Sequence, residues 1–204
     1  MKLLFTGFEP FGGEDVNPSW EAVKLLPDEI GGASIYRVCL PVEYQGSVRR
    51  AQEEFANLMP DAVVSVGQAG GRRGLSLERV ALNIDDATVP DNAGVLLRDT
   101  PIRRGAPSAY FSTLPLRNME SALSAAGLEA HVSNTAGTYV CNHLMFSMLD
   151  YISVRMLKTR AGFVHVPYIP SQCRYRPDVP YMELENIAKG LVVIANELAQ
   201  GAGK

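Results

Sequence analysis

The sequence predicts an α/β fold, a single three-layer α/β/α domain around a twisted, mostly parallel sheet. Strand-like and helical segments alternate along the chain, which is the pattern of β-α-β units in a parallel sheet. The mostly apolar run 62–66 fits a strand that is covered on both faces. At 204 residues the chain is most simply one domain, residues 1–204.

The expected elements follow from local signals. Residues 2–6 form a short buried strand that Gly7 ends. Asn17 before Pro18 is typical of a helix start, with Asn as the N-cap and Pro in the first helical position, and this helix runs to Pro27. The other expected strands are 34–42, 62–66, 110–113, 129–133 and 161–166, and the other helices are 45–58, 115–126, a segment from about 141 to 158–160, and 182–198.

Composition excludes several classes of partner. The net charge of -3 provides no basic surface for nucleic acid or an anionic membrane. The apolar run after Lys2 is too short for a signal peptide or a membrane span, so we expect a cytoplasmic protein. The odd number of cysteines, Cys39, Cys141 and Cys173, without a tight spacing, indicates neither a disulfide framework nor a zinc site.

The stretch 133–150 places Cys141 near the first turn of a helix. There, unpaired backbone N–H groups and the positive end of the helix dipole favour thiolate over thiol. The same N–H groups can hold a developing oxyanion. The alternative is that Cys141 is a small buried hydrophobic residue, as free cysteines often are.

An imidazole and a carboxylate are expected near this cysteine. His165 lies at the carboxyl end of an apolar strand, where ligand crevices form in open α/β sheets, although a core histidine bonded to backbone is the alternative. We expect Glu78 to meet His165 and Cys141 at the same rim of the sheet. A thiol, an imidazole and a carboxylate suffice for acyl transfer. His143, two residues after Cys141, falls on another helix face, and His131 is expected to be structural.

Three loops each allow more than one interpretation from their residues alone. Phe8 and Phe11 either plug the core or line a pocket for a flat ligand. The glycine-rich segment 67–74 predicts a turn where the backbone passes close to another segment or a ligand. Asp85, Asp86 and Asp91 fit hydrogen-bonded turns; a divalent metal is conceivable, but the spacing matches no EF-hand loop, so no metal is expected.

Four blocks of the chain together resemble one known family. They are G-F-E-P-F-G-G-x-x-x-N-P-S near the start, E-R-V-A-L-N-I-D-D-A-T-V-P-D-N-A-G in the middle, S-N-T-A-G-T-Y-V-C-N around Cys141 and G-F-V-H-V-P-Y near the end. Their order and spacing, over roughly the first 170 residues, are similar to those of the pyroglutamyl peptidase I (pyrrolidone-carboxylate peptidase) cysteine peptidases.

The resemblance implies an exopeptidase that removes an N-terminal pyroglutamyl residue from peptides through an acyl-enzyme, without metal or organic cofactor. Cys141 would be the nucleophile, His165 the general base and acid, and Glu78 the residue that orients His165. The family's members are intracellular, are commonly homo-oligomers, and have a fold similar to the one predicted above. Small peptides with an N-terminal pyroglutamate are therefore the expected partners.

The resemblance also implies a substrate pocket. Phe8, Phe11 and Tyr139 would pack around the pyrrolidone ring with Val140 alongside. Asn17 and Gln68 would meet the polar edge of the lactam, Gln68 through its backbone. Such a pocket suits a small flat lactam without an amino-terminal charge, because a charged ammonium group would be left there without a partner.

One position departs from the family pattern. Thr88 stands where Arg is expected in many relatives, and threonine cannot stabilise a reacting carbonyl with a positive charge. Arg72, Arg73 and Arg79 are possible substitutes. Loss of one oxyanion donor typically costs about 10²-fold or more in turnover, so a slow enzyme would be no surprise. A nucleoside phosphorylase-like transferase and a non-catalytic binding protein remain as alternatives, since similar architectures host both.

Overall fold

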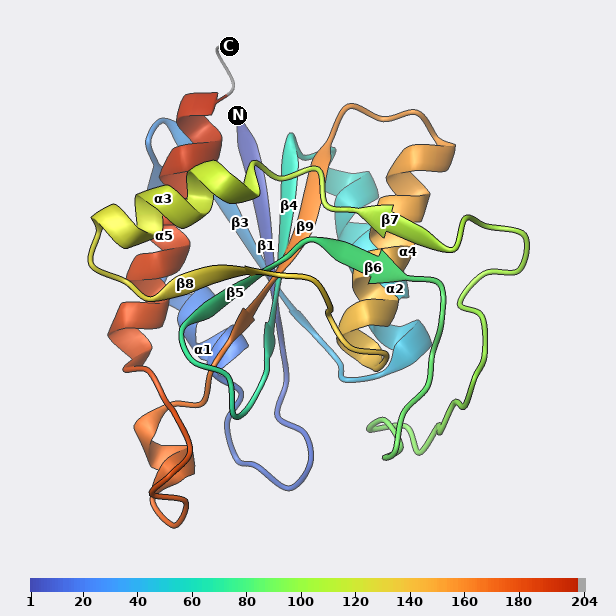
Figure 1. Ribbon diagram of the computed structural model, residues 1–204. Helices are drawn as coiled ribbons and strands as arrows, with labels where there is room; N and C mark the ends of the chain where they lie inside the picture. Colours follow the sequence, from blue (N-terminus) through green and yellow to red (C-terminus); the bar gives the residue numbers. More distant parts are fainter. Residues whose placement is uncertain (202–204) are drawn as a thin grey trace.

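The computed structural model describes residues 1–201, so the last three residues of the predicted domain lie outside the described part. Figure 1 shows a central sheet with helices on both of its faces. The sheet contains β1 (Lys2–Phe8), β2 (Glu29–Ile30), β3 (Ala33–Leu40), β4 (Ala62–Gln68), β5 (Leu75–Glu78), β8 (Ala130–Ser133) and β9 (Arg160–Val166), while β6 (Val80–Leu82) pairs with β7 (Ala109–Phe111) in a separate two-stranded sheet.

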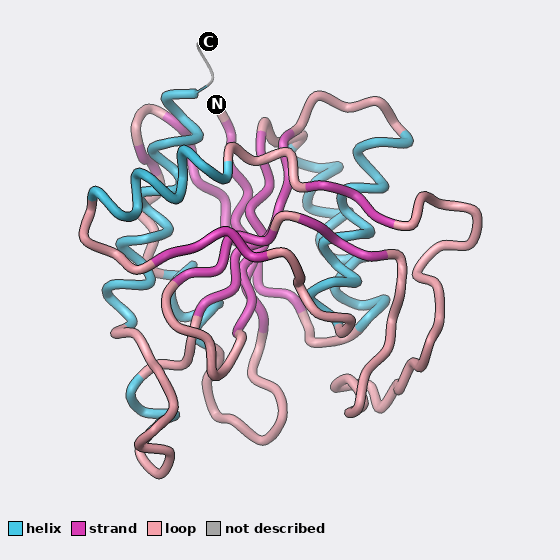
Figure 2. The backbone as a smooth tube through the Cα atoms, in the orientation of Figure 1, coloured by secondary structure: helices cyan, strands magenta, loops and turns pink. Residues whose placement is uncertain are grey.

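The helices are arranged in two layers. They are α1 (Pro18–Lys24), α2 (Tyr44–Leu58), α3 (Leu116–Ala125), α4 (Val140–Val154), α5 (Leu184–Gln200) and the short 3₁₀ helix η1 (Pro170–Cys173). In Figure 2 the strands form a middle layer between the two groups of helices. Side chains from α1, α3 and α5 share one hydrophobic core with the sheet, and side chains from α2 and α4 share the other. The predicted three-layer α/β/α fold is confirmed.

The strand order creates a place for a ligand. The order is β2-β3-β1-β4-β9-β5-β8, and the pairs β3-β1, β1-β4, β4-β9 and β5-β8 are parallel. From β1 the chain moves through α1 to β3 on one side, and then through α2 to β4 on the other side. The paired register of β1 with β4 ends at Thr6 and Ser65, although both strands continue. The two strands therefore diverge at a topological switch point, where open α/β sheets form their crevices.

Several predicted boundaries were wrong. Gly7 does not end the first strand, which continues to Phe8. A Cβ atom on Gly7 would lie 2.6 Å from the Cα atom of Trp20, so the glycine instead lets α1 pack closely on the strand. The first helix ends at Lys24 rather than Pro27, but Asn17 is its N-cap as predicted, with Oδ1 accepting from Ser19 N at 3.1 Å.

The end of α4 also differs from the prediction. The helix ends at Val154, so the cations at 158–160 do not complement its dipole, and Arg160 begins β9 instead. Leu157 N donates to Ile152 O across this end. Among residues 1–201, no helix combines the length and the apolar character needed to cross a bilayer.

Candidate active site

The N-terminus of α4 carries Cys141. Tyr139 is the N-cap and Cys141 is the second residue of the helix. The first backbone hydrogen bond of the helix runs from His143 N to Tyr139 O, at 3.0 Å. The N–H groups of residues 140–142 precede it and have no acceptor within the helix. These groups lie at the helix end that carries Cys141 and are suited to binding a negatively charged oxygen.

Asn142 fixes this end of α4 against β6. Its side chain is fully buried, and its Oδ1 accepts from Leu82 N at 2.9 Å. Its Nδ2 donates to Leu82 O at 2.9 Å and to Ile84 O at 3.0 Å. Three hydrogen bonds from one buried amide to the backbone hold the helix start rigidly. The sequence analysis assigned no role to this residue, although a polar residue next to the candidate nucleophile, in an apolar helix, was a visible signal.

Cys141 and His165 lie on the same face of the sheet. Gly67 in β4 pairs with His165 in β9, and paired residues in neighbouring strands project to the same side. A Cβ atom on Gly67 would lie 2.9 Å from Cys141 Sγ and 2.7 Å from Phe163 Cζ. The absence of a side chain at Gly67 therefore makes room for the thiol beside His165. This is a close approach of the kind that the glycine-rich segment 67–74 predicts.

Glu78 bonds to the imidazole from the neighbouring strand. His165 Nδ1 lies 2.7 Å from Glu78 Oε1, and the side chains are 5% and 0% exposed. Glu78 therefore meets His165 as expected, but not at a shared carboxyl edge of the sheet, because β5 runs antiparallel to β9. Glu78 lies opposite Phe163 in the neighbouring strand, and His165 is two residues further along that strand on the same face. The carboxylate therefore reaches the imidazole along a diagonal between the two strands.

Burial is the largest influence on the pKa values of Cys141 and His165. Burial raises the pKa of Cys141 to about 12, with a further increase from the charge of Glu78, while Arg72 lowers it. Burial thus acts against the sequence-based expectation that the helix start favours a thiolate, and it favours the thiol. Burial also lowers the pKa of His165, although the hydrogen bond to Glu78 opposes this, so the resting imidazole is neutral.

For Glu78, hydrogen bonds and nearby charges outweigh burial in setting the pKa. Burial raises the pKa of Glu78, but the hydrogen bond and charge of His165, together with Ser133 and Arg72, outweigh burial and lower it overall. Glu78 is thus ionised and accepts the Nδ1 hydrogen. The imidazole is left with Nε2 as its basic nitrogen.

A small cavity adjoins Cys141. It is lined by Phe8, Phe11, Asn17, Val42, Gln68, Tyr139, Val140 and Cys141, and its volume is about 40 Å³. All six residues that the family resemblance implies for substrate binding are in this set, together with the candidate nucleophile. Val42 was not expected in the cavity; it lies two residues after Leu40, where β3 ends. The cavity lies beside the ends of β1 and β4, at the switch point of the sheet.

Hydrogen bonds fix the orientation of the two amide side chains that line this cavity. Asn17 Oδ1 accepts from Ser19 N and Oγ, and Asn17 Nδ2 donates to Glu9 O at 2.9 Å. One N–H of the Asn17 amide is left for a ligand. Gln68 Oε1 accepts from Gln172 Nε2 at 2.9 Å, and Gln172 was missed because its distance in sequence from Gln68 hides the contact.

The other candidates lie elsewhere. His143 is buried and its Nδ1 lies 2.7 Å from Asp85 Oδ2, while His131 Nε2 lies 3.2 Å from Ser76 Oγ. Asp91 accepts backbone N–H groups of Tyr44, Ala93 and Val95, which is a turn-forming role. Within residues 1–201, no group of three or more His, Cys, Asp or Glu side chains has the arrangement of a metal site.

Thr88 is exposed on the loop between β6 and β7, and the three arginines considered as substitutes differ in position. Arg72 bonds to Glu78 at 2.5 Å. Arg73 lies beside Glu129 and Pro177, and Arg79 lies beside Leu114 and Val132, in surface hollows that do not include Cys141.

Comparison with known proteins shows the family to which this chain belongs. The model of the pyroglutamyl peptidase family matches residues 1–201. The chain is 50% identical, over 94% of both chains, to pyrrolidone-carboxylate peptidase 1 of Caldanaerobacter subterraneus subsp. tengcongensis. It is 51% identical, over 95% of its length and 93% of the relative's, to the pyrrolidone-carboxylate peptidase of Thermococcus kodakarensis.

Solved structures agree. The crystal structure of pyroglutamyl peptidase I from Bacillus amyloliquefaciens superposes with a TM-score of 0.95 at 42% identity, covering 98% of this chain and 97% of that one. A mutant pyrrolidone carboxyl peptidase from Pyrococcus furiosus gives a TM-score of 0.94 at 38% identity, covering 99% and 100%. By sequence and by fold, this chain belongs to the pyroglutamyl peptidase family.

Proposed function

We propose that this protein hydrolyses the amide bond after an N-terminal pyroglutamyl residue of peptides, with residues 1–204 acting as one catalytic domain and with no cofactor. Cys141 is the nucleophile, His165 the general base and acid, and Glu78 the group that orients His165. The observation that carries the proposal is the cavity in which the six predicted substrate-binding residues and Cys141 lie together.

The first half of the reaction forms an acyl-enzyme. His165 Nε2 removes the proton from the Cys141 thiol as sulfur attacks the pyroglutamyl carbonyl carbon, since burial keeps the resting thiol protonated. Backbone N–H groups at the start of α4 hold the oxyanion. The imidazolium, stabilised by Glu78, then gives its proton to the leaving amine, and the peptide departs.

The second half uses water. His165 takes a proton from water as its oxygen attacks the thioester carbonyl, and the thiolate leaves and recovers the proton from the imidazolium. Pyroglutamate is released with a free carboxylate. Each half of the reaction returns His165 to neutrality, which suits a buried imidazole whose pKa is lowered.

The cavity wall accounts for the choice of substrate. Phe8, Phe11, Tyr139 and Val140 present apolar faces to the pyrrolidone ring. The remaining Asn17 N–H and the Gln68 backbone meet its polar edge. An uncyclised glutamyl or prolyl terminus would bring an ammonium group against apolar walls, and an unpaired charge there costs several kcal/mol or shifts its pKa.

The test is release of a fluorescent amine from pyroglutamyl-amide, beside prolyl-amide and glutamyl-amide controls. We expect turnover of the pyroglutamyl substrate alone, abolished by iodoacetamide and by Cys141→Ser. Cys141→Ser should still bind a pyroglutamyl ligand. Activity that survives both treatments would point to the transferase alternative, in which no thiolate is needed, and wild-type protein that binds but never turns over would point to a binding protein.

We further propose a cytoplasmic homo-oligomer without nucleic-acid or membrane partners. The net charge of -3 supports the absence of polyanion binding. Exposed apolar side chains on β7 and on the loop between β6 and β7 support self-association; they are Val89, Val95, Leu96 and Phe111. Light scattering on the purified protein measures the number of subunits, and a monomer at micromolar concentration would contradict the proposal.

A further inference from the structure

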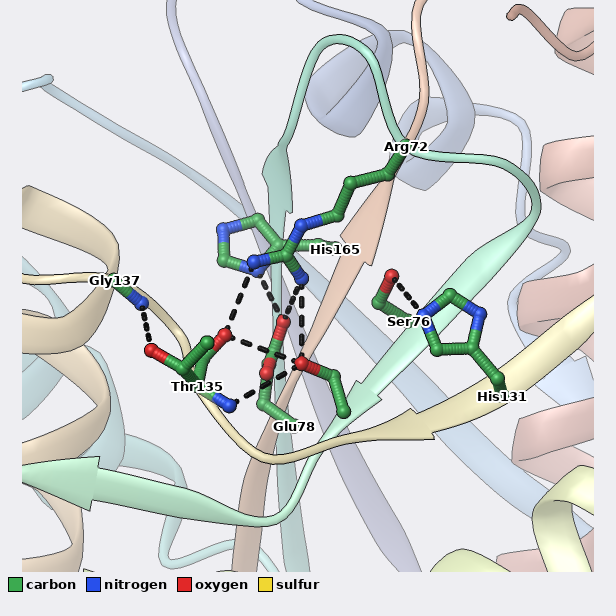
Figure 3. A network of polar contacts seen from close by, with 8 residues as sticks. Arg72, Ser76, Glu78, His131, Thr135, Gly137 and His165 are labelled. Atoms are coloured by element: carbon green, nitrogen blue, oxygen red, sulfur yellow. Dashed lines mark hydrogen bonds and ion pairs between the residues drawn. The ribbon is translucent and has the colours of Figure 1, made fainter.

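Arg72 joins the carboxylate side of the candidate active site to the loop before the nucleophile. It lies between β4 and β5, and its Nη1 donates to Glu78 Oε1 at 2.5 Å. The same carboxylate oxygen is 2.7 Å from His165 Nδ1. Figure 3 shows the guanidinium beside His165 and Glu78 and reaching towards Thr135.

The second nitrogen of the guanidinium binds the loop that enters α4. Arg72 Nη2 donates to Thr135 O at 3.0 Å, and Nη1 lies 3.5 Å from Ser133 Oγ. Further along this loop, Gly137 N donates to Thr135 Oγ1 at 3.1 Å, and Thr138 Oγ1 donates to Asp86 O at 2.6 Å. Two residues after Thr138, the loop becomes the helix that carries Cys141.

The ion pair between Arg72 and Glu78 is only weakly screened by solvent. The Arg72 side chain is 29% exposed and the Glu78 side chain is fully buried. A planar guanidinium fixes directions as well as charge, because its N–H groups leave at set angles. Lysine has the charge but cannot bind the carboxylate and the Thr135 carbonyl through one rigid plane.

We propose that Arg72 is a positioning residue that holds the Glu78 carboxylate against His165 and ties it to the 133–139 loop, so that the base and the nucleophile keep one relative geometry. This inference rests on the proposed peptidase function. Arg72 acts through Glu78 and through the loop and contacts no reacting atom. Misplacement of a base by about 1 Å can cost on the order of 10²-fold in rate.

The charge of Arg72 has a separate effect on proton transfer. It lowers the pKa of His165, in the same direction as burial, and it lowers the pKa of Cys141, against burial. Replacing Arg72 by a neutral residue therefore raises the pKa of His165, so a larger fraction of the imidazole is already protonated at mildly acidic pH. The acid limb of the rate profile then moves to higher pH.

The experiment compares Arg72→Gln, Arg72→Lys and a matched control, Arg73→Gln. Arg73 is the next residue in the chain and lines a separate surface hollow. The measurement is kcat and KM on pyroglutamyl-amide across pH, with thermal unfolding alongside. For Arg72→Gln we expect kcat to fall about 10- to 100-fold and KM to change little. We also expect the acid limb of the rate profile to move to higher pH. Arg72→Lys keeps the charge, so its acid limb should lie at the wild-type pH, but its kcat should stay low. Arg73→Gln should resemble wild type in both.

Two results would overturn the inference while leaving the peptidase itself intact. One is an active wild type with a folded Arg72→Gln variant whose kcat and pH profile are unchanged. The other is a lower unfolding temperature with an unchanged profile, which would make Arg72 structural only. Should Arg72→Gln not fold, full kcat in Arg72→Lys overturns it equally. A wild type that releases no amine would instead refute the proposed function.

Discussion

Gly67 determines how closely Cys141 can approach the sheet. Its missing Cβ leaves the space that Sγ and the Phe163 ring occupy. For Gly67→Ala, we expect turnover of pyroglutamyl-amide to fall about 10²-fold, because the methyl group displaces the sulfur from His165. Overpacking should lower the free energy of unfolding by only about 1–3 kcal/mol, so the variant should stay folded.

Gly201→Ala is the control for that substitution. Gly201 follows α5, and a Cβ atom there would come no closer than 3.6 Å to Arg160 Nη1. This variant should keep wild-type turnover and stability. Wild-type turnover in Gly67→Ala would contradict the placement of the thiol.

The pH dependence of the rate follows from the shifted pKa values of His165 and Cys141. Burial lowers the pKa of His165 from its ordinary value of 6.5, and activity requires the neutral imidazole. As the pH falls, kcat/KM should therefore decline only below about 6.5, the ordinary histidine value. Burial raises the pKa of Cys141 to about 12, so thiol ionisation should not limit the rate below about pH 9. An acid limb centred above neutrality would contradict a neutral resting imidazole.

At the scale of elements, Asn142 couples α4 to β6. Asn142→Ala leaves the backbone N–H and C=O of Leu82 and the C=O of Ile84 without their partner. Unpaired buried groups of this kind should lower the free energy of unfolding by about 2–4 kcal/mol, measured by urea denaturation. We also expect a lower kcat, because the helix start carries Cys141.

The matched control is Asn118→Ala on α3. Asn118 is exposed, so its loss should change the free energy of unfolding by no more than about 0.5 kcal/mol. If both asparagine variants were equally stable, α4 would be held by packing alone.

Also at this scale, the direction of β5 decides how the carboxylate reaches the imidazole. A parallel β5 would bring Glu78 to the carboxyl edge of the sheet, together with His165. The antiparallel pairing instead places Ser76 opposite His165 and Glu78 one diagonal step away, in the interior. Glu78 is completely buried as a result, and it needs Arg72 and His165 as partners.

For the whole molecule, the buried imidazole links stability to pH. The unfolded chain protonates His165 near its ordinary pKa of 6.5, whereas the folded protein resists protonation because its pKa is lowered. Below pH 6.5 the unfolded state binds more protons, so stability falls as pH falls towards the folded pKa. Glu78 also has a lowered pKa, and its contribution is lost at still lower pH, as it too becomes protonated in the folded state.

Urea denaturation at pH 7.5 and 5.5 tests this linkage. We expect wild type to lose more stability between these values than His165→Gln, which has no imidazole to charge. His131→Gln should lose as much as wild type, because His131 is exposed. An equal loss in wild type and His165→Gln would contradict the sign of the shift.

The sequence by itself determined the class of fold and the chemical composition of the candidate site. Alternating strands and helices require two helical layers on a mostly parallel sheet, and the Asn17-Pro18 cap and the apolar strands are local signals that tertiary contacts did not override. The six residues expected around a substrate pocket came from the family resemblance, because the residues alone left Phe8 and Phe11 open between a plug over the core and a pocket wall.

Only the tertiary structure decided how these groups face one another. The direction of β5 depends on long-range pairing, which leaves no periodic signal in a four-residue strand. The pKa of Cys141 depends on how much protein covers the sulfur, and burial here raises it. The contact of Arg72 with Thr135 joins residues 63 positions apart, and only packing of the complete sheet brings them within hydrogen-bond distance.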